Sequence, residues 1–306
     1  MKLTLGKSGW PVTVTEFDFN TATDDEINIL GCLTNYYTLV VVKNQNLTVR
    51  TEESVCRKIG KTLDETYDKN NNNLWSKMKT MFGPVHERLA QPGGEITLRV
   101  TGEKNKNGDP GLFGSKEELK WHANGVWQEF RRSMVWLYGD KGTPGSITSF
   151  TNHIIAYNKM SNDFKDKIKD LKSVYKIIYH YAEREVFKKD YAISEVNFPL
   201  VYTNVGGQTG IFLSWLHLYH FEGMTPEESA TIADAIRDSI LLDPECVYDH
   251  HWEDGDVLLM EQWLGVHKRH AFEHMDKRVL HRVETDFSKI DFTKMSDAVK
   301  LVVAQQ

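Results

Sequence analysis

The spacing of apolar residues predicts helices in the first part of the chain. Over residues 24–37 they recur at the intervals of an amphipathic helix, with Thr23 or Asp24 placed to cap its start. The β-branched run TLVVVKNQ at 38–45 predicts a buried strand directly after that helix. Residues 51–63 have helical spacing again, although a serine stands where a capping box would have glutamate. The front of the chain is therefore expected to form a helix, a strand and a second helix.

Short apolar runs separated by glycine, proline and other turn residues fill the second half of the chain. MVWLYGD at 134–140, SITSFT at 146–151 and KRVLHRVETDF at 277–287 have the length and composition of strands. A helix is expected over 161–171, and another after the capping box TPEE at 225–228. This order favours an α+β, mainly β fold with a jelly-roll (double-stranded β-helix, cupin-like) core and flanking helices over alternating βαβ units.

The length of the chain bears on its domain organisation. At 306 residues it is long for one domain, but β-barrels with insertions reach this size. No internal repeat is visible, so we expect a single domain spanning 1–306, with a helical insertion at about 161–190. A glycine- and lysine-rich loop at about 101–119 precedes His122 and is either a mobile lid or a solvated insertion.

Charge and composition exclude several classes of function. The formal net charge is −6 and no run of five or six like charges occurs, which argues against a nucleic-acid partner. Neither a dinucleotide-binding GxGxxG after a strand nor a phosphate-binding GxxxxGK[ST] is present. No apolar stretch approaches the ~18 residues needed to span a bilayer, so no membrane partner is expected.

The cysteines indicate the compartment. Cys32, Cys56 and Cys246 are odd in number and widely spaced, which argues against a disulfide framework and fits a reducing environment. The first residues lack the apolar segment of a secretory signal. We therefore expect a cytoplasmic protein.

Candidate chemistry begins with KWHANGVWQ at 120–128. His122 ends a strand-like segment, and Asn124 stands two positions later, where a metal site usually has a carboxylate. Alternate residues of a regular strand share one face, so both side chains can reach one metal if the strand continues. His267 is a distal histidine that could join them. The other histidines, including His217, are expected at ordinary barrel or loop positions.

Four motifs follow one another in order: EELKWHANGVW, GSITSFTNHIIAYNKMS, WEDGDVLLMEQWLGVH and DKRVLHRV. Arg278 lies eleven residues after His267, and Arg282 lies four residues later. In this order and spacing the chain resembles the taurine/2-oxoglutarate dioxygenase (TauD/TfdA-like) family of non-haem iron(II) oxygenases, over roughly 118–283. The resemblance implies Fe(II) as the metal, 2-oxoglutarate as cosubstrate, and O₂ and a small-molecule substrate as partners.

The resemblance also implies roles for individual residues. His122, Asn124 and His267 occupy the positions of the metal ligands, two imidazoles and one oxygen donor that leave sites open on iron(II). Arg278 would bind the distal carboxylate of 2-oxoglutarate through its planar fork, and Thr148 would bind the same carboxylate. These five residues make up the expected iron and cosubstrate site.

Both arginines of the last motif also have alternative interpretations that involve no cosubstrate. Arg278 could instead form a surface salt bridge with Asp276 or Glu284. The family uses the position of Arg282 variably, to bind the cosubstrate or the substrate. An ordinary structural role is the alternative.

The substrate pocket is less well defined by the sequence. Its candidate lining residues are Phe113 in the loop before the first histidine, Trp127, Tyr202 and Asn204, and ordinary packing is the alternative for each. The lysines of the loop and the nearby Arg282 favour a small polar, anionic or zwitterionic substrate. Nothing in the sequence selects one compound.

Asn124 departs from the family, which has an aspartate at this position. A neutral amide oxygen can coordinate a divalent ion but does not offset its charge, so metal binding should weaken, while the dianionic cosubstrate restores part of it by chelation. Three interpretations stay open: a weaker ligand in a working oxygenase, a residue that orients a metal-bound water, or a site without redox chemistry. An iron halogenase, in which chloride replaces the carboxylate, is less favoured because asparagine leaves no obvious space.

The leading hypothesis is an iron(II)- and 2-oxoglutarate-dependent dioxygenase that hydroxylates a small polar or anionic substrate and releases succinate and CO₂. A catalytically silent jelly-roll module that binds a ligand or partner through the same pocket is the alternative. A metal hydrolase is less favoured because the site lacks a third strong ligand and a general base. Assembly into a homo-oligomer stays open.

Overall fold

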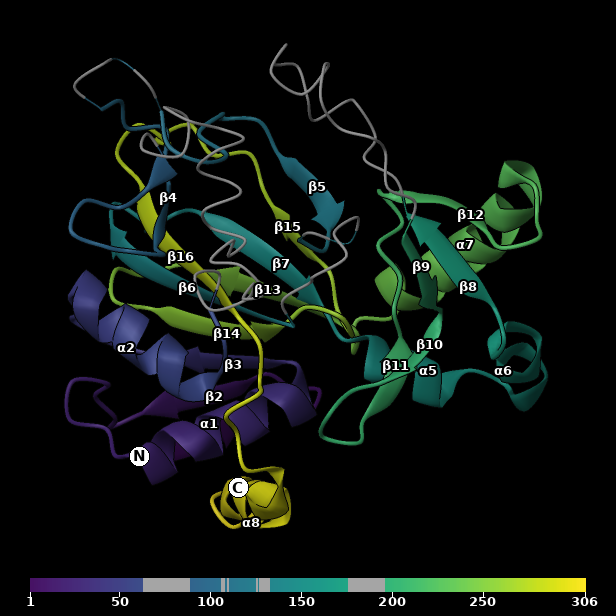
Figure 1. Cartoon of the computed structure of the whole chain (residues 1–306), viewed down its shortest axis with the longest axis horizontal. Helices are drawn as coiled ribbons and strands as arrows, with labels where there is room; N and C mark the ends of the chain where they lie inside the picture. Colours follow the sequence, from purple (N-terminus) through teal and green to yellow (C-terminus); the bar gives the residue numbers. More distant parts are fainter. Residues whose placement is uncertain (63–88, 106–107, 109, 125, 127–132, 176–195) are drawn as a thin grey trace, which may run out of the picture.

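Two facing β-sheets form the body of the protein (Figure 1). The computed structural model describes residues 1–62, 89–105, 108, 110–124, 126, 133–175 and 196–306. The larger sheet has the strand order β1 (Lys2–Leu5), β2 (Val12–Thr15), β3 (Leu39–Val42), β14 (Val257–Glu261), β6 (Met134–Lys141), β16 (Val279–Thr285) and β4 (Leu98–Val100). The smaller has the order β13 (Val247–His251), β7 (Ile147–Thr151), β15 (His267–Arg269) and β5 (Leu119–His122).

The inner faces of the two sheets enclose a hydrophobic core. Leu258 and Met260 of β14 belong to it, and Phe150 of β7 joins them from the smaller sheet. The alternate residues Val257 and Leu259 belong to a second core on the other face of the larger sheet, as the two-residue period of a strand requires. Neighbouring strands within both sheets are antiparallel except β2 with β3. The expected α+β, mainly β jelly roll is confirmed.

Helices cover the outer face of the larger sheet, and the second core lies between them and the strands. These helices are α1 (Asp24–Tyr37), α2 (Val49–Ile59) and α8 (Met295–Val303). Helix α1 begins with a capping box, in which Thr23 Oγ1 accepts from the Glu26 N–H and the Glu26 carboxylate accepts from the Thr23 N–H. The expected bounds of α1 are confirmed, with Thr23 as its cap.

The expected bounds of the second helix were wrong at both ends. Helix α2 begins two residues before position 51 because the Thr48 hydroxyl accepts from the N–H of Thr51, 3.2 Å away, and caps the helix there. It ends at Ile59, and Gly60 closes its last turn with a hydrogen bond to Cys56 O.

A second lobe stands beside the barrel (Figure 1). Its elements are a sheet of β12 (Leu218–Phe221), β8 (Lys172–Tyr175) and β9 (Val196–Pro199), a hairpin of β10 (Val201–Thr203) and β11 (Thr209–Ile211), and helices α5 (His153–Lys159), α6 (Asn162–Ile168) and α7 (Pro226–Leu241).

The expected helical insertion at 161–190 needs correction. Helix α6 lies within it, but β8 follows, because Ser173, Val174 and Tyr175 pair with strands on both sides. The part of the insertion after Tyr175 lies outside the described residues. Helix α7 begins with the expected capping box of Thr225 and Glu228.

The remaining features complete the fold. A 3-10 helix, η3 (Phe292–Lys294), leads into α8. All three cysteines are free and buried, which confirms that they form no disulfide framework. In the part of the chain that the structure describes, no helix combines the length and apolar character needed to cross a bilayer.

Candidate active site

His122 and His267 lie side by side where β5 and β15 meet. They are direct cross-strand partners, and their ring centroids are 4.3 Å apart. On its other edge β15 pairs with β7, which places the Phe150 ring 6.2 Å from that of His267. Both histidines are buried. The register of the smaller sheet thus brings two imidazoles from distant parts of the chain to one point.

The hydrogen bonding of His122 leaves one ring nitrogen for a metal. Nδ1 lies 2.6 Å from the Lys120 carbonyl oxygen, and because a carbonyl can only accept, Nδ1 carries the proton. Nε2 then has a lone pair, and it is buried without a hydrogen-bond partner among the described residues. Nδ1 of His267 is also buried and unpaired there. A backbone carbonyl that orients the non-ligating nitrogen is a common feature of histidine metal ligands.

Burial keeps both imidazoles neutral at physiological pH. It lowers the pKa of His122 to about 4, against the opposing effect of the Lys120 hydrogen bond, and the nearby Arg282 and Arg269 lower it further. Burial likewise lowers the pKa of His267 well below its usual value; the charge of Arg282, and the charge that His122 would carry if protonated, add to the effect. Neutral imidazole is the form that ligates a metal.

We therefore predict that the affinity of the chain for Fe(II) changes little as the pH falls from about 7.5 to about 5.5. With ordinary pKa values of ~6.5, proton competition would lower the affinity about tenfold for each histidine over that interval. Anaerobic calorimetric titration with Fe(II) at a series of pH values measures the effect. A loss of affinity of tenfold or more would show that the imidazoles are not held neutral.

Asn124 lies in a turn that two other side chains hold in place. Strand β5 ends at His122, so the regular strand assumed for the two-residue spacing does not extend this far. The Asn124 N–H donates to Gln262 Oε1 at 3.1 Å, and the Ala123 N–H donates to Ser214 Oγ at 3.2 Å. The Asn124 side chain is buried, and its Nδ2 has no partner within the described ranges. Because buried amides normally find partners, this NH2 group has capacity left to donate to a bound ligand, whereas a metal would bind the amide oxygen, Oδ1.

Arg278 is a buried cation with no carboxylate partner among the described residues. It is 1% exposed, its Nε donates to Ser146 Oγ at 3.1 Å, and its guanidinium lies 5.9 Å from the centroid of the Trp252 ring. Burial lowers its pKa to about 9, and the charge of Arg269 contributes. The alternative of a surface salt bridge is wrong. An unpaired buried charge costs several kcal/mol, so this position suits a bound anion.

Thr148, on β7, is connected to Arg278 through Trp252. The indole Nε1–H donates to Thr148 Oγ1 at 2.9 Å, and the same indole lies against the guanidinium. Because the hydroxyl accepts from the indole, its own proton is available for another acceptor. The two residues expected to bind the cosubstrate carboxylate are therefore grouped around one tryptophan.

Arg282 is also buried, but it has a carboxylate partner. Its Nη2 forms an ion pair with the Glu284 carboxylate. Burial lowers the pKa of Arg282 to about 10. Its charge lowers the pKa of both His122 and His267.

Arg269 belongs to the site, although the sequence reasoning missed it. Its guanidinium donates to the carbonyl oxygens of Phe113, Ser115 and Glu117, and the bond to Ser115 is 2.8 Å. These contacts fasten the end of the 101–119 loop to β15. Arg269 follows His267 by two positions on the same strand, so the two-residue period could have identified it.

His217 also lies near the metal-ligand candidates, contrary to the ordinary position expected for it. Burial lowers its pKa to about 3, and the charge that His122 would carry if protonated lowers it further. Its Nδ1 lies 3.0 Å from Ser214 Oγ, the group that accepts from Ala123 N–H. No local sequence signal reveals this contact because it joins the second lobe to the end of β5.

The residues expected to line the substrate pocket do not all lie together. Phe113 lies near the imidazoles, with its ring centroid 6.4 Å from that of His122. Tyr202 belongs to an aromatic cluster in which its ring lies 5.0 Å from that of Trp263. Trp127 lies outside the described residues.

Asn204 has a structural role that argues against contact with a substrate. Its Nδ2 donates to Asn35 O at 2.9 Å, and its Oδ1 accepts from the N–H groups of Gly206 and Gln208. The side chain thus shapes the turn between β10 and β11.

The donor set suits a metal bound by two imidazoles and an amide. Within the described ranges, no group of three histidine, cysteine, aspartate or glutamate side chains could hold a metal. The unpaired ring nitrogens of His122 and His267 are free to bind a metal, and the buried Asn124, two residues from His122, has an amide oxygen that could join them. Such a set fits Fe(II), and Arg278 fits the anionic end of a chelating cosubstrate.

Solved structures with the same fold are readily found. A crystal structure of AAD-2 in complex with Mn(II) and N-oxalylglycine superposes with a TM-score of 0.72 at 16% identity, covering 94% of this chain and 98% of that one. The structure of a taurine dioxygenase from Burkholderia xenovorans has a TM-score of 0.70 at 16% identity, and the match covers 93% of this chain and 90% of that one. At these identities the likeness concerns the fold.

Relatives with assigned activities are distant in sequence. The alpha-ketoglutarate-dependent 2,4-dichlorophenoxyacetate dioxygenase of Burkholderia sp. (strain RASC) is 24% identical over 184 residues, which is 57% of this chain and 60% of the relative. Pentalenolactone F synthase of Streptomyces arenae is 22% identical over 192 residues, or 57% and 64% of the two chains. The matches thus span about three-fifths of the relatives' length. Residues 3–283 match the family model described as taurine catabolism dioxygenase TauD, TfdA family, and the chain belongs to this family.

Proposed function

We propose that the protein is an iron(II)- and 2-oxoglutarate-dependent dioxygenase that hydroxylates a small polar or anionic substrate and releases succinate and CO₂. Two observations carry the proposal: two buried, neutral imidazoles lie side by side, and a buried guanidinium, which has no carboxylate partner among the described residues, is linked through Trp252 to Thr148 on the strand next to His267. Family membership supports the same class of reaction.

Each residue of the site has a distinct task in this proposal. His122, His267 and Asn124 would hold iron, which when bound supplies the coordination sites and redox capacity for oxygen chemistry. The Lys120 carbonyl keeps His122 in the tautomer that presents Nε2. Arg278 would grip the distal carboxylate of 2-oxoglutarate with two parallel hydrogen bonds.

The surroundings of these residues would position the cosubstrate and exclude water. The Trp252 ring and the Ser146 hydroxyl fix the Arg278 guanidinium, so little side-chain entropy is lost when the carboxylate binds. Thr148 would donate its remaining proton to that carboxylate. Phe113, held over the site by Arg269, shields the imidazoles from solvent.

The charge of the site favours an anionic substrate. Arg269 and Arg278 are buried with no ion pair among the described residues, whereas Arg282 is paired with Glu284. With asparagine at position 124, the site also lacks the negative charge that an aspartate would add. After the distal carboxylate of 2-oxoglutarate neutralises one guanidinium, positive charge remains for a substrate carboxylate or sulfonate.

Succinate formation tests the proposal. The chain is supplied with Fe(II), 2-oxoglutarate and O₂, together with matched pairs of candidates such as phenoxyacetate and phenoxyethanol. We expect an anionic member of the panel to stimulate succinate release and its neutral counterpart to have little effect. If no compound stimulates release and no basal turnover of 2-oxoglutarate occurs, the catalytically silent binding module becomes the better account.

Replacing Asn124 with aspartate should strengthen Fe(II) binding. Interactions with a charged group exceed those with a neutral one by about 1–2 kcal/mol, which corresponds to about a tenfold gain in affinity. Anaerobic titration of the variant and the wild type in the absence of 2-oxoglutarate measures it. Asp24→Asn, an exposed substitution on α1, serves as a control. Equal affinity for Asn124→Asp and wild type would place residue 124 outside the coordination sphere.

A further inference from the structure

A cavity of about 420 Å³ opens on the helix side of the larger sheet, away from the inner core that contains Phe150. Glu261, at the end of β14, lies on its wall and shares a strand face with Val257 and Leu259, which pack beneath the helices. Side chains from several parts of the chain complete the wall: the end of α1, Ser133 before β6, β10 and the turn after it, Trp263 after β14, and the segment that runs from β16 into η3. None of the candidate metal ligands lines it. The volume is in the range of small-molecule sites.

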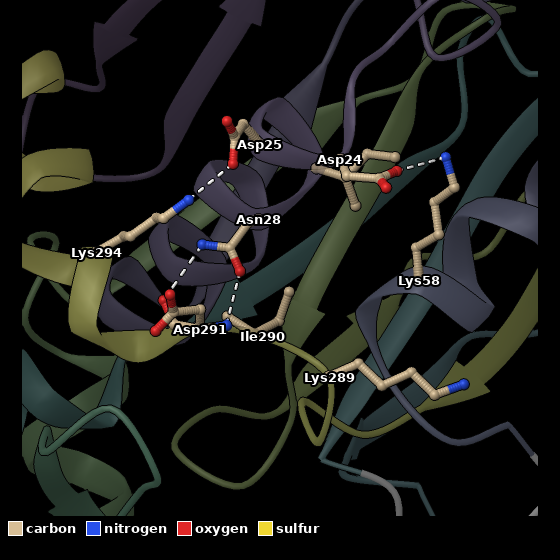
Figure 2. A pocket seen from close by; sticks show the side chains of 9 residues that line it. Asp24, Asp25, Asn28, Lys58, Lys289, Ile290, Asp291 and Lys294 are labelled. Carbon is tan, nitrogen blue, oxygen red and sulfur yellow. Dashed lines mark hydrogen bonds and ion pairs between the residues drawn. The ribbon is translucent and has the colours of Figure 1, made fainter.

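A second cavity, of about 300 Å³, provides a contrast (Figure 2). It lies between α1 and the segment before α8, and its charged side chains face one another. Asp24 pairs with Lys58 at 2.8 Å and Asp25 with Lys294 at 2.7 Å, while Asn28 bonds to the backbone of Asp291. None of the side chains that line this cavity has a buried polar atom without a partner in the described part of the chain, so it carries no inference about a ligand.

The larger cavity differs because two of its buried polar side chains have unused groups. Glu261 is 1% exposed, and its Oε2 accepts from the N–H groups of Trp263 and Leu264, while Oε1 has no partner in the described part of the chain. Asn35 is equally buried, and neither Oδ1 nor Nδ2 of its amide has a partner there. Buried polar groups are nearly always hydrogen-bonded, so these atoms call for a ligand or ordered water.

The charge and shape of the cavity indicate which ligand would satisfy them. Its charged lining residues are the carboxylic acids Glu261 and Asp286, and no lysine, arginine or histidine among the described residues lines it. Burial raises the pKa of Glu261 to about 8, a cost that a cation beside the carboxylate would offset. The rings of Trp263 and Phe292 provide apolar walls that also attract cations.

We propose that this cavity is a binding site for a small organic ammonium ion, separate from the iron and cosubstrate site. The ammonium group donates to Glu261 Oε1 and to Asn35 Oδ1, the two acceptors without partners. The apolar body of the ligand packs against Tyr202, Trp263 and Phe292. A neutral alcohol of the same shape keeps the apolar contacts but offers no charge to stabilise the ionised carboxylate, so Glu261 keeps its proton near neutral pH.

The test compares two probes of matched shape, 2-phenylethylammonium and 2-phenylethanol, by calorimetric titration of the full chain. The ammonium is expected to bind at least about tenfold more tightly than the alcohol, because a charge-assisted hydrogen bond to the carboxylate is available to it alone. Glu261→Gln retains an acceptor for the Trp263 and Leu264 N–H groups and is expected to weaken ammonium binding by about tenfold or more. Asn35→Leu removes the second acceptor and is expected to weaken it by a smaller factor.

Two controls make the outcome decisive. Asp24→Asn, in the cavity of Figure 2, should leave ammonium binding unchanged, and so should His267→Ala, which disables the iron site. Binding that persists in His267→Ala supports the second site even if the protein proves catalytically silent. Equal affinity for the two probes, no detectable binding of the ammonium, or unchanged binding in a folded Glu261→Gln variant would overturn the proposal.

Discussion

Replacing Arg278 with glutamine is expected to raise the Kd for 2-oxoglutarate by about 30-fold to 1000-fold. Removing one partner of a buried, hydrogen-bonded charge pair costs about 2–4 kcal/mol, and each ~1.4 kcal/mol corresponds to a factor of ten in affinity. Arg278 is 1% exposed and has no carboxylate partner among the described residues, so its substitution by glutamine breaks no internal ion pair. The variant should therefore fold, and its apo form should be about as stable as the wild type.

The affinity is measured by anaerobic titration of the iron-loaded chain with 2-oxoglutarate. Arg237→Gln is the matched control because it makes the same substitution at a partly exposed arginine of α7 that pairs with Asp234 and Asp238. In thermal unfolding, 2-oxoglutarate should stabilise the wild type and the control but not Arg278→Gln. Unchanged affinity in Arg278→Gln would place the distal carboxylate elsewhere.

Replacing His267 with alanine should lower Fe(II) affinity by more than about 100-fold. Loss of a residue that merely orients a metal ligand costs about 10- to 100-fold, so loss of a ligand should exceed that range. The effect should be larger here than in a site with a carboxylate, because Asn124 contributes no charge to hold the ion. Calorimetry with Fe(II) under anaerobic conditions gives the affinity.

His251→Ala is the control for this substitution, since His251 is an exposed histidine on β13. It should bind Fe(II) like the wild type. If His267→Ala retained wild-type affinity, the metal site would have to be built from other residues.

Local features could be predicted from the sequence because they depend on neighbouring residues. The capping boxes at Thr23 and Thr225 define the starts of α1 and α7 through contacts three residues apart. The start of α2 was misplaced because Thr48 and Thr51 are both acceptable caps, and tertiary context selects the first. Strand β8 was missed because four residues carry little periodic signal and the pairing with β9 and β12 decides their conformation.

In the candidate site, too, some residues could be predicted from the sequence and others depend on tertiary contacts. The motif spacing led to His122 and His267, which are buried where β5 and β15 meet, and to Arg278, which is buried against Trp252. The role of Arg269 was missed although it lies two positions from His267, because its partners are backbone carbonyls that no sequence pattern displays. His217 was missed because its place beside the site depends on packing of the second lobe.

Contacts between remote segments also explain why the cavity around Glu261 was not foreseen. Its wall requires α1, the turn after β10 and the segment after β16 to meet, which no local pattern reports. Asn204, expected beside the substrate, instead joins two of these segments through its bond to Asn35 O. The roles of side chains at such meeting points become clear only when the tertiary structure is known.

Anaerobic absorption spectroscopy tests the central claim most directly. When Fe(II) and 2-oxoglutarate are added together to the chain, we expect a visible metal-to-ligand charge-transfer band that saturates near one equivalent of each and is absent with either alone. The band should be lost in His267→Ala and should require much more 2-oxoglutarate in Arg278→Gln. No band at saturating concentrations of both, in a chain that remains folded, would contradict an iron and cosubstrate site at His122, Asn124 and His267.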